Sequence, residues 1–179
     1  MTGKPAFSRT IPAGDTIERA VCDHCGFVAY DNPKIVVGSV VRHDGRVLMC
    51  RRAIEPRRGF WTIPAGYLEF GETPEQGARR EAREEANALL ALKELLAIYT
   101  VTRIGQVQMF FRASLTDGQF SPGAESLETD LFAWDDIPWT ELAFPTVRWV
   151  LTHDRAAETG QGRLPFGNPD GESADLTER

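Results

Sequence analysis

The segment from Thr73 to Ala86 constrains the fold more than any other part of the chain. Thr73 has a hydroxyl that can cap a helix, Pro74 suits the first helical position, and Gln76 completes a capping box. The pattern predicts a helix that continues to about Ala86. Asn87 follows, and asparagine tolerates the left-handed conformation that often ends a helix. We therefore expect a helix with both ends specified locally.

Three glutamates of this helix, Glu81, Glu84 and Glu85, lie on one face within an arc of roughly 100°. The adjoining arc carries only small side chains, which would let the helix lie close against a sheet: Ala78, Ala82 and Ala86. A solvated acidic surface would have the same spacing. Glu69 and Glu72 come just before the helix, however, and so many carboxylates together repel one another unless a cation neutralises them. Oxygen ligands of this kind suit Mg²⁺ or Mn²⁺.

Apolar and β-branched runs predict strands on both sides of the helix. Asp44-Gly45 favours a tight turn between the first two runs, and Gly105 lies in the turn between two longer ones. Near the end of the chain, the segment from Pro138 to about Asp154 has apolar residues that could form one helical face, and Pro145 argues for a helix start near that point. The predicted strands are Ile35–Val41, Val47–Cys50, Phe60–Ile63, Ala91–Arg103, Gln106–Leu115 and Leu131–Trp134. These elements predict an α/β sandwich with a mixed β-sheet between helices.

Proline, glycine and charge divide the chain into three parts. Residues 1–33 lack apolar periodicity and predict an irregular leader. Residues 34–154 hold the predicted strands and helices and form the folded domain. Residues 155–179 are rich in glycine and charge, and we expect a flexible tail.

Composition limits the classes of partner. The chain has 179 residues and a net charge of −6, from 26 acidic and 20 basic side chains, which disfavours nucleic acid or an anionic membrane as a partner. There is no apolar run as long as the roughly 20 residues of a membrane span. Its 3 cysteines are too few for a disulfide framework, so we expect a cytoplasmic protein with reduced thiols.

The helix and the loop before it resemble a known family motif. Gly66, Glu72, Arg80-Glu81-Ala82 and Glu84-Glu85 match the Nudix box in identity and register. That box reads Gly-x5-Glu-x7-Arg-Glu-U-x-Glu-Glu-x-Gly-U, where U is aliphatic. Asn87 replaces the last glycine, and this substitution should preserve the turn.

The resemblance implies the Nudix fold and hydrolysis of a nucleoside diphosphate linked to another group. It implies that Glu81, Glu84 and Glu85 bind Mg²⁺ or Mn²⁺ with help from the Gly66 carbonyl. Glu72 and Arg80 would form an ion pair between loop and helix. The general base would be Glu81 or an acid of the later loop, Glu125 or Glu128, and the sequence does not decide between them.

The flanking sequence resembles one Nudix subgroup, which has a zinc-ribbon-like leader and includes plant FAD and ADP-ribose pyrophosphatases. The matching segments are Cys22-x-x-Cys25-Gly26, Tyr30-x-Asn32-Pro33-Lys34, Cys50–Pro56, Phe60–Gly66 and Pro122–Glu128. FAD or ADP-ribose is therefore the expected substrate, and similar enzymes are commonly homodimers. The alternatives are a nucleoside triphosphate pyrophosphohydrolase and a nucleotide sensor without catalysis.

Two further groups of residues allow a functional and a structural interpretation. Cys22 and Cys25 form one zinc knuckle, but a structural zinc site needs four ligands and the leader has no second pair of cysteines, so we do not expect zinc. A cluster of arginines close to Trp61 could bind phosphate or could balance nearby acids. The candidates for substrate contact are Arg51, Arg52, Arg58 and Glu125, while Trp61, Phe70, Phe110 and Phe111 are expected in the core or in the wall of a site.

Overall fold

The computed structural model describes residues 6–174 of the chain. The chain forms two compact units, Met1–Pro33 and Lys34–Arg179. No helix within residues 6–174 is both long enough and apolar enough to span a membrane.

The N-terminal unit is a small antiparallel sheet. Its strands β1 (Phe7–Thr10), β2 (Arg19–Cys22) and β3 (Val28–Ala29) are hydrogen-bonded in the order β1-β2-β3. The prediction of an irregular leader was therefore wrong for the described residues. Strands of two to four residues with mostly exposed or half-exposed side chains carry too little alternation of apolar and polar residues to be recognised from sequence.

The larger unit is built on a mixed seven-stranded sheet with the central order β10-β5-β4-β9-β8. Strands β4 and β9 are parallel, and the other strand pairs are antiparallel. The predicted turn between β4 and β5 is confirmed, because Asp44 and Gly45 both have positive φ. The five long strands are β4 (Lys34–His43), β5 (Arg46–Arg52), β8 (Leu90–Val101), β9 (Gln106–Leu115) and β10 (Ser126–Phe132).

Strands β4 and β5 pair only next to their turn and then diverge. Two short strands fill the gap: β6 (Trp61–Thr62) pairs with β5, and β7 (Ala65–Tyr67) pairs with β4. Gly38 makes this possible, because a Cβ there would lie 2.5 Å from the Cβ of Ala65. The arrangement places Gly66 in the sheet opposite Val37.

Helix α1 (Pro74–Ala86) is the predicted acidic helix, and its ends are confirmed. The Thr73 hydroxyl accepts from the backbone N–H of Gln76, the Gln76 side chain accepts from the backbone N–H of Thr73, and Asn87 ends the helix with φ 47°. Its alanine face is fully buried against the sheet, as expected: Ala78, Ala82 and Ala86. Small side chains thus bring the backbone of α1 close to the strands.

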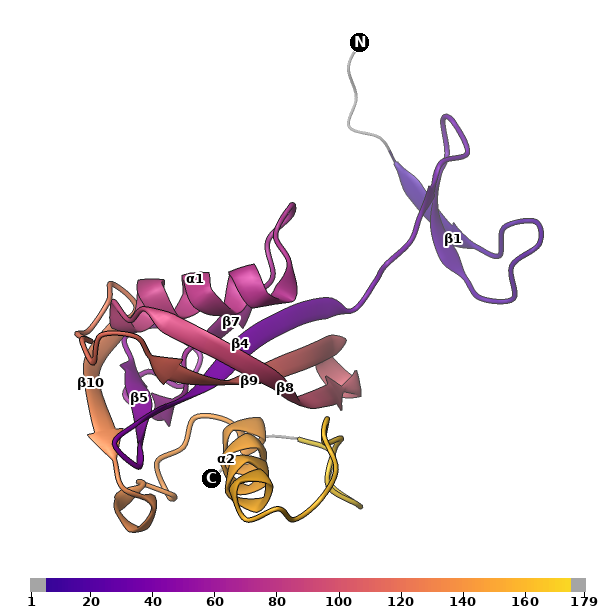
Figure 1. The fold of residues 1–179 in the computed structure, drawn as a ribbon. Coiled ribbons are helices and arrows are strands. Elements are labelled where there is room, and N and C mark those ends of the chain that lie inside the picture. Colours follow the sequence, from indigo (N-terminus) through magenta and orange to yellow (C-terminus); the bar gives the residue numbers. More distant parts are fainter. Residues whose placement is uncertain (1–5, 175–179) are drawn as a thin grey trace. The chain divides into compact units, whose positions relative to one another are not determined.

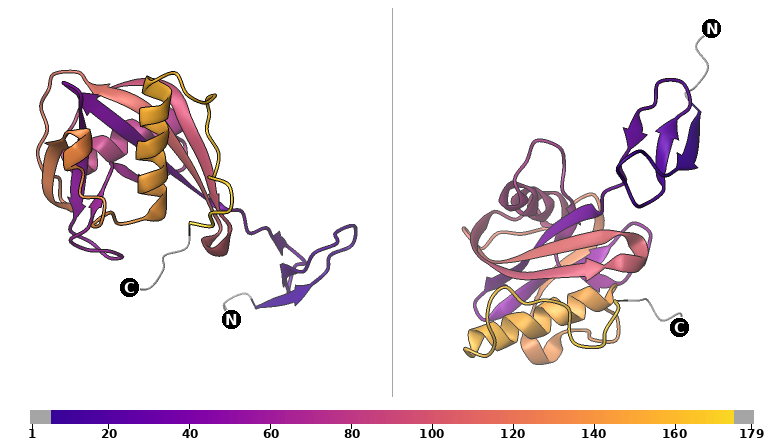
Figure 2. Two further views of the ribbon diagram at one scale, coloured as in Figure 1. Left: turned by 90° about the horizontal axis from the view of Figure 1, so that it is seen from below. Right: turned by 90° about the vertical axis from the view of Figure 1, so that its right-hand side faces the viewer.

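Helix α2 (Pro145–Glu158) begins at the predicted proline and covers the sheet face opposite α1 (Figure 1). Two short 3-10 helices, η1 (Thr102–Ile104) and η2 (Trp134–Asp136), lie in the connections. The core between α2 and the sheet is rich in large apolar side chains, among them Met49, Leu96, Tyr99, Phe110, Trp149 and Leu151. The predicted α/β sandwich with its mixed sheet between helices is confirmed, and Figure 2 shows the two helices on the two sides.

The described part of the predicted tail is attached to the sheet. Helix α2 continues to Glu158, and Phe166 then pairs with β8, since its N–H donates to the Leu96 carbonyl at 2.8 Å and its carbonyl accepts from Ile98 at 2.9 Å. The Phe166 ring stacks on His153 of α2. Composition predicts a flexible tail from residue 155, whereas α2 extends to Glu158 and the contacts of Phe166 attach the following segment to the sheet, a packing that composition does not reveal. Residues 175–179 lie outside the described part.

A buried ion-pair network attaches α2 to the sheet. Asp154 is 1% exposed and accepts from Arg42 of β4 at 2.5 Å and from Arg112 of β9 at 2.8 Å. Each arginine also binds one half-exposed glutamate, Glu158 or Glu94. Two arginines therefore surround one buried carboxylate.

We predict that Asp154→Ala lowers the free energy of unfolding by about 3–5 kcal/mol, because it leaves two guanidinium groups without their buried partner. Urea denaturation measures the change. Glu158→Gln is the control, since its carboxylate is half-exposed, and it should cost less than about 1 kcal/mol. Equal losses from the two variants would contradict the assigned role of the buried pair.

Candidate active site

Arg80 gathers the acidic residues of the loop and the helix. Its guanidinium donates to both carboxylate oxygens of Glu72, at 2.7 and 3.1 Å, to Glu81 at 2.7 Å and to Glu84 at 2.9 Å. A further N–H donates to the backbone carbonyl of Tyr67 at 2.9 Å. The hydrogen bonds from Arg80 hold the pKa of Glu72 below its usual value. One side chain thus connects the loop after β7 with the carboxylate face of α1.

Two of the three helix carboxylates are buried. Glu81 and Glu85 are 8% and 5% exposed, whereas the Glu84 side chain is 55% exposed. Glu85 accepts from the Ala65 N–H at 3.0 Å, and a Cβ on Gly66 would lie 2.4 Å from both oxygens of Glu81. Only glycine therefore allows the carboxylate of Glu81 to touch this backbone.

Burial sets the protonation of these carboxyl groups. It raises the pKa of Glu85 to about 8, opposed by the hydrogen bond from Ala65 and reinforced by the charge of Glu81. Burial also raises the pKa of Glu81, although Arg80 offsets part of that shift. A cation at this place would favour the charged form of both groups.

The carboxylates do not yet converge on a single point. Within residues 6–174, no group of three histidine, cysteine or acidic side chains is arranged to enclose a metal ion. The reason is that Arg80 lies between Glu81 and Glu84, while Glu85 points to the Ala65 N–H. A metal would need Glu84 to turn away from Arg80, which its exposure allows.

The loop between β9 and β10 lies directly on the C-terminal end of α1. Gly123 donates its N–H to the Glu85 carbonyl at 3.0 Å, and a Cβ there would lie 1.7 Å from the Glu84 carbonyl oxygen. The Asn87 side-chain amide donates to the carbonyls of Ser121 and Pro122 and to the Ser121 hydroxyl, at 3.0–3.3 Å. Asn87 therefore both ends the helix and holds the loop that carries Glu125.

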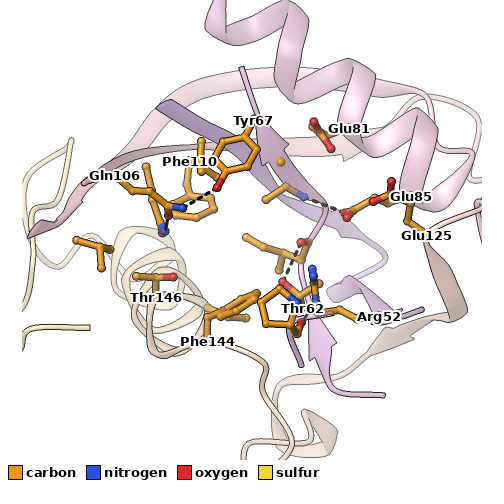
Figure 3. A pocket seen from close by; sticks show the side chains of 18 of the residues that line it. Arg52, Thr62, Tyr67, Glu81, Glu85, Gln106, Phe110, Glu125, Phe144 and Thr146 are labelled. Carbon is orange, nitrogen blue, oxygen red and sulfur yellow. Dashed lines mark hydrogen bonds between the residues drawn. The ribbon is translucent and has the colours of Figure 1, made fainter. Parts of the chain in front are cut away.

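A cavity of about 630 Å³ opens beside these carboxylates (Figure 3). Glu81, Glu85 and Glu125 lie at one side of it, and Tyr67, Gln106 and Phe110 lie at the other. Arg52, Thr62, Phe144 and Thr146 complete the wall that Figure 3 labels. The cavity thus has an acidic end and an end lined by amide, phenol and aromatic groups. Its volume is within the usual range for small-molecule sites.

The structure brings together most of the predicted site residues at the cavity and leaves four of them outside its wall. Gly66, Arg80, Glu81, Glu84, Glu85, Arg52 and Glu125 line the cavity, and Glu72 supports Arg80 from outside. Arg51, Arg58 and Glu128 do not line it, which differs from the prediction. Arg51 instead pairs with Glu128 at 3.4 Å. Neighbouring residues of a strand point to opposite faces, so Arg52 faces the cavity and Arg51 faces away, beside its partner on β10.

Sequence reasoning missed the residues at the far end of the cavity. Gln106 and Gln108 alternate with the half-buried apolar residues Val107 and Met109 along β9, and Tyr67 comes directly after Gly66. Two amides on one face of a central strand are the signal that could have identified this end. The expectation for the large aromatics was correct for Trp61, Phe110 and Phe111 and wrong for Phe70, which is fully exposed.

The N-terminal unit supplies too few ligands for a structural zinc site. Cys22 is buried and Cys25 is exposed, and both are free thiols. The pKa of Cys22 is lowered by hydrogen bonds from the backbone N–H groups of Cys25 and His24. Residues 1–33 hold no cysteine or histidine besides Cys22, His24 and Cys25, and a tetrahedral structural zinc needs four ligands. The residues present do not fit the metal.

Comparison with family models gives two matches. The NUDIX domain model matches residues 32–154, which is more than half of the chain. A second model, described as Nudix N-terminal and named for a zinc ribbon, matches residues 3–31. The N-terminal unit thus resembles a zinc ribbon although it has only one pair of cysteines.

Individual proteins agree with this. A NUDIX hydrolase structure from Nitrosomonas europaea is 44% identical, with a TM-score of 0.85, and the match covers 90% of this chain and 92% of that one. A MutT-like protein from Streptomyces ambofaciens is 38% identical over 57% of this chain and 64% of its own length. An ADP-ribose pyrophosphatase from Methanocaldococcus jannaschii is 28% identical over 64% of this chain and 69% of its own length. The predicted family is confirmed: the chain belongs to the Nudix hydrolase family.

Proposed function

We propose that this protein hydrolyses the diphosphate bridge of a nucleoside diphosphate linked to a second group, with ADP-ribose as the preferred substrate. The observation that carries the proposal is the cavity itself, which has three glutamates of α1 at one end and amide and aromatic side chains at the other. A diphosphate suits the acidic end once a cation is bound. A relative named ADP-ribose pyrophosphatase supports the choice of substrate. FAD, which has the same kind of bridge, is the second candidate.

The donor set fits Mg²⁺ or Mn²⁺. Glu81, Glu84 and Glu85 offer carboxylate oxygens, and the Gly66 backbone lies against the carboxylate of Glu81. Hard divalent cations prefer oxygen ligands of this kind. When bound, the metal screens the charge of the diphosphate and activates water for attack on phosphorus. Arg80 holds two of these carboxylates close together and keeps their repulsion low.

Glu125 is the proposed general base. It lines the cavity beside Glu85, whereas Glu128 is paired with Arg51 outside the cavity wall. Glu125 would take the proton from the attacking water while the new phosphorus–oxygen bond forms and the bond to the bridging oxygen breaks. Hydrolysis of ADP-ribose in this way yields AMP and ribose 5-phosphate.

Arg52 is the proposed phosphate contact. Its Nε donates to the Pro56 carbonyl at 2.8 Å, and its guanidinium carbon lies 5.2 Å from the centre of the Phe144 ring. These two contacts orient the planar group at the cavity wall. A guanidinium held in this way can bind a phosphate oxygen with its terminal N–H groups.

A substrate panel tests the proposal. We expect turnover of ADP-ribose with Mg²⁺ or Mn²⁺, slower turnover of FAD, and little turnover of nucleoside triphosphates. Product analysis should find AMP and ribose 5-phosphate in equal amounts. A preference for triphosphates would favour a nucleoside triphosphate pyrophosphohydrolase, for which the MutT-like relative is the supporting observation. Binding without turnover of any member of the panel would favour a nucleotide sensor.

Two variants serve as the internal control of this panel. Glu84→Gln and Glu85→Gln should each reduce metal-dependent kcat about 100-fold or more, because a bound metal contributes several kcal/mol to the transition state. Glu128→Gln removes the same charge outside the cavity wall and should keep wild-type turnover. Normal activity of both helix variants would contradict the assignment of the metal ligands.

The raised pKa of Glu85 predicts that metal affinity depends on pH. Burial raises this pKa to about 8, so below pH 8 a metal must displace a proton to use the carboxylate. The apparent affinity for Mn²⁺ should therefore increase about tenfold for each pH unit between pH 6 and 8 and then level off. Titration of Mn²⁺ followed by electron paramagnetic resonance measures it.

Glu85→Gln should show weaker Mn²⁺ binding with a shallower pH dependence, because that site no longer carries a displaceable proton. Glu128→Gln should keep the wild-type dependence of Mn²⁺ affinity on pH. A wild-type affinity that stays constant from pH 6 to 8 would exclude Glu85 as a ligand.

Gly123 lies in close contact with the backbone of α1, which predicts that the residue at this position determines where the loop holds Glu125. An alanine Cβ would lie 1.7 Å from the Glu84 carbonyl oxygen, so Gly123→Ala must push the loop away from α1. We expect kcat to fall at least about tenfold, since a well-placed general base contributes 10²–10⁴-fold. Gly167→Ala is the matched control, because a Cβ there meets no atom within 4 Å. Wild-type kcat in a folded Gly123→Ala protein would show that the loop contact is not needed.

A further inference from the structure

The far end of the cavity contains a row of hydrogen-bonded polar side chains. The side-chain amide of Gln108 donates to the side-chain oxygen of Gln106 at 3.0 Å, and the side-chain amide of Gln106 donates to the Tyr67 hydroxyl at 3.1 Å. Both glutamines belong to β9 and lie on the same face of the sheet. In this row, both side-chain amides donate in the direction of Tyr67.

This row ends in a hydrogen-bond acceptor without a partner. Among the described residues, the side-chain oxygen of Gln108 is one of the few buried polar atoms that receive no hydrogen bond. Gln108 is 9% exposed and lines the cavity. A buried acceptor that lacks a donor costs free energy, and a ligand that supplies the donor recovers it. The last torsion of a glutamine side chain is soft, so a small rotation of the amide can bring this oxygen to a ligand.

The surroundings of Gln108 suit a flat ring. Four apolar side chains from β4, β8, β9 and η1 line this end of the cavity, together with Arg103 of η1: Val36, Val101, Ile104 and Phe110. Flat aromatic bases bury their faces against such side chains. The chemistry that fits is a nucleobase whose edge carries an N–H donor.

We propose that Gln108 determines base specificity by accepting a hydrogen bond from an exocyclic amino group, and that Gln106 and Tyr67 position it. The amino group of adenine is such a donor. Hypoxanthine carries a carbonyl oxygen at the same place, and two acceptors facing each other would leave the buried oxygen of Gln108 unpaired. The inference rests on the proposed function, because it assigns the base of that substrate to the end of the cavity away from the carboxylates (Figure 3).

Binding of AMP and IMP tests the inference without turnover. Titration calorimetry of the full chain should give a dissociation constant at least about tenfold lower for AMP than for IMP. Equal affinities, or tighter binding of IMP, would overturn the proposal. 2′-Deoxy-AMP should bind like AMP. If the deoxy compound is discriminated and IMP is not, the donor is a sugar hydroxyl and the proposal is wrong.

Substitutions then test whether Gln108 causes the selectivity for AMP over IMP. Gln108→Met keeps the length of the side chain and removes the acceptor, so the ratio between AMP and IMP should fall to about one. Gln106→Met leaves Gln108 in place without its fixed orientation and should lower the ratio partially. Gln119→Met is the matched control, because Gln119 is an exposed glutamine outside the cavity, and it should keep the wild-type ratio.

Turnover separates this inference from the proposed function. Turnover of ADP-ribose is compared with turnover of its hypoxanthine counterpart. Gln108→Met should raise KM for the adenine substrate about tenfold and leave kcat within about twofold of the wild-type value. Hydrolysis of both substrates at equal kcat/KM by the wild type would reject the base assignment and keep the proposed reaction. Hydrolysis of neither would reject the proposed reaction, while the binding ratio still tests the base assignment. Should Gln108→Met fail to fold, the wild-type AMP and IMP affinities decide alone.

Discussion

The Arg80 guanidinium is the interaction on which the rest of the site depends. It binds Glu72 in the loop and Glu81 and Glu84 in the helix, and it also reaches the Tyr67 carbonyl. Four groups are held at fixed angles, which requires the planar fork of five N–H donors that arginine has and lysine lacks. Without this cation, the carboxylates would repel one another at the point where the loop must pack against α1. The same contacts that stabilise the loop therefore determine where a divalent metal and a diphosphate can bind.

The sequence was sufficient to predict those elements that are specified by residues close together in the chain. The hydroxyl of Thr73 and the amide of Gln76 specify the start of α1 by direct hydrogen bonds, and Asn87 specifies its end by its own backbone conformation. The turn at Asp44-Gly45 is likewise encoded by two adjacent residues with positive φ. The glutamates of α1 could be grouped because helical periodicity alone puts them on one face.

The sequence was insufficient wherever the outcome depends on partners far along the chain. The sequence does not distinguish Arg51 from Arg52, which are adjacent arginines. The pairing of β5 with β10 gives Arg51 a carboxylate partner and leaves Arg52 at the cavity. Phe166 attaches the residues after α2 to the sheet only because β8 offers backbone hydrogen-bond partners and the His153 ring stacks on its side chain. Pairing of this kind is set by tertiary structure, which propensity does not contain.

The two ends of the cavity differ in how the chain encodes them, and this difference explains why the reaction is easier to infer than the substrate. The acidic end comes from one continuous segment, Gly66 to Glu85, together with Glu125. A segment of this kind can be kept intact in proteins that share little else. The opposite end is assembled from β4, β7, β9, η1 and the start of α2, so a single change such as Gln108 to another residue alters it without affecting the carboxylates. Relatives of the same family can therefore keep the chemistry at phosphorus while they change the group that the cavity accepts. The relatives named MutT-like protein and ADP-ribose pyrophosphatase are consistent with this division.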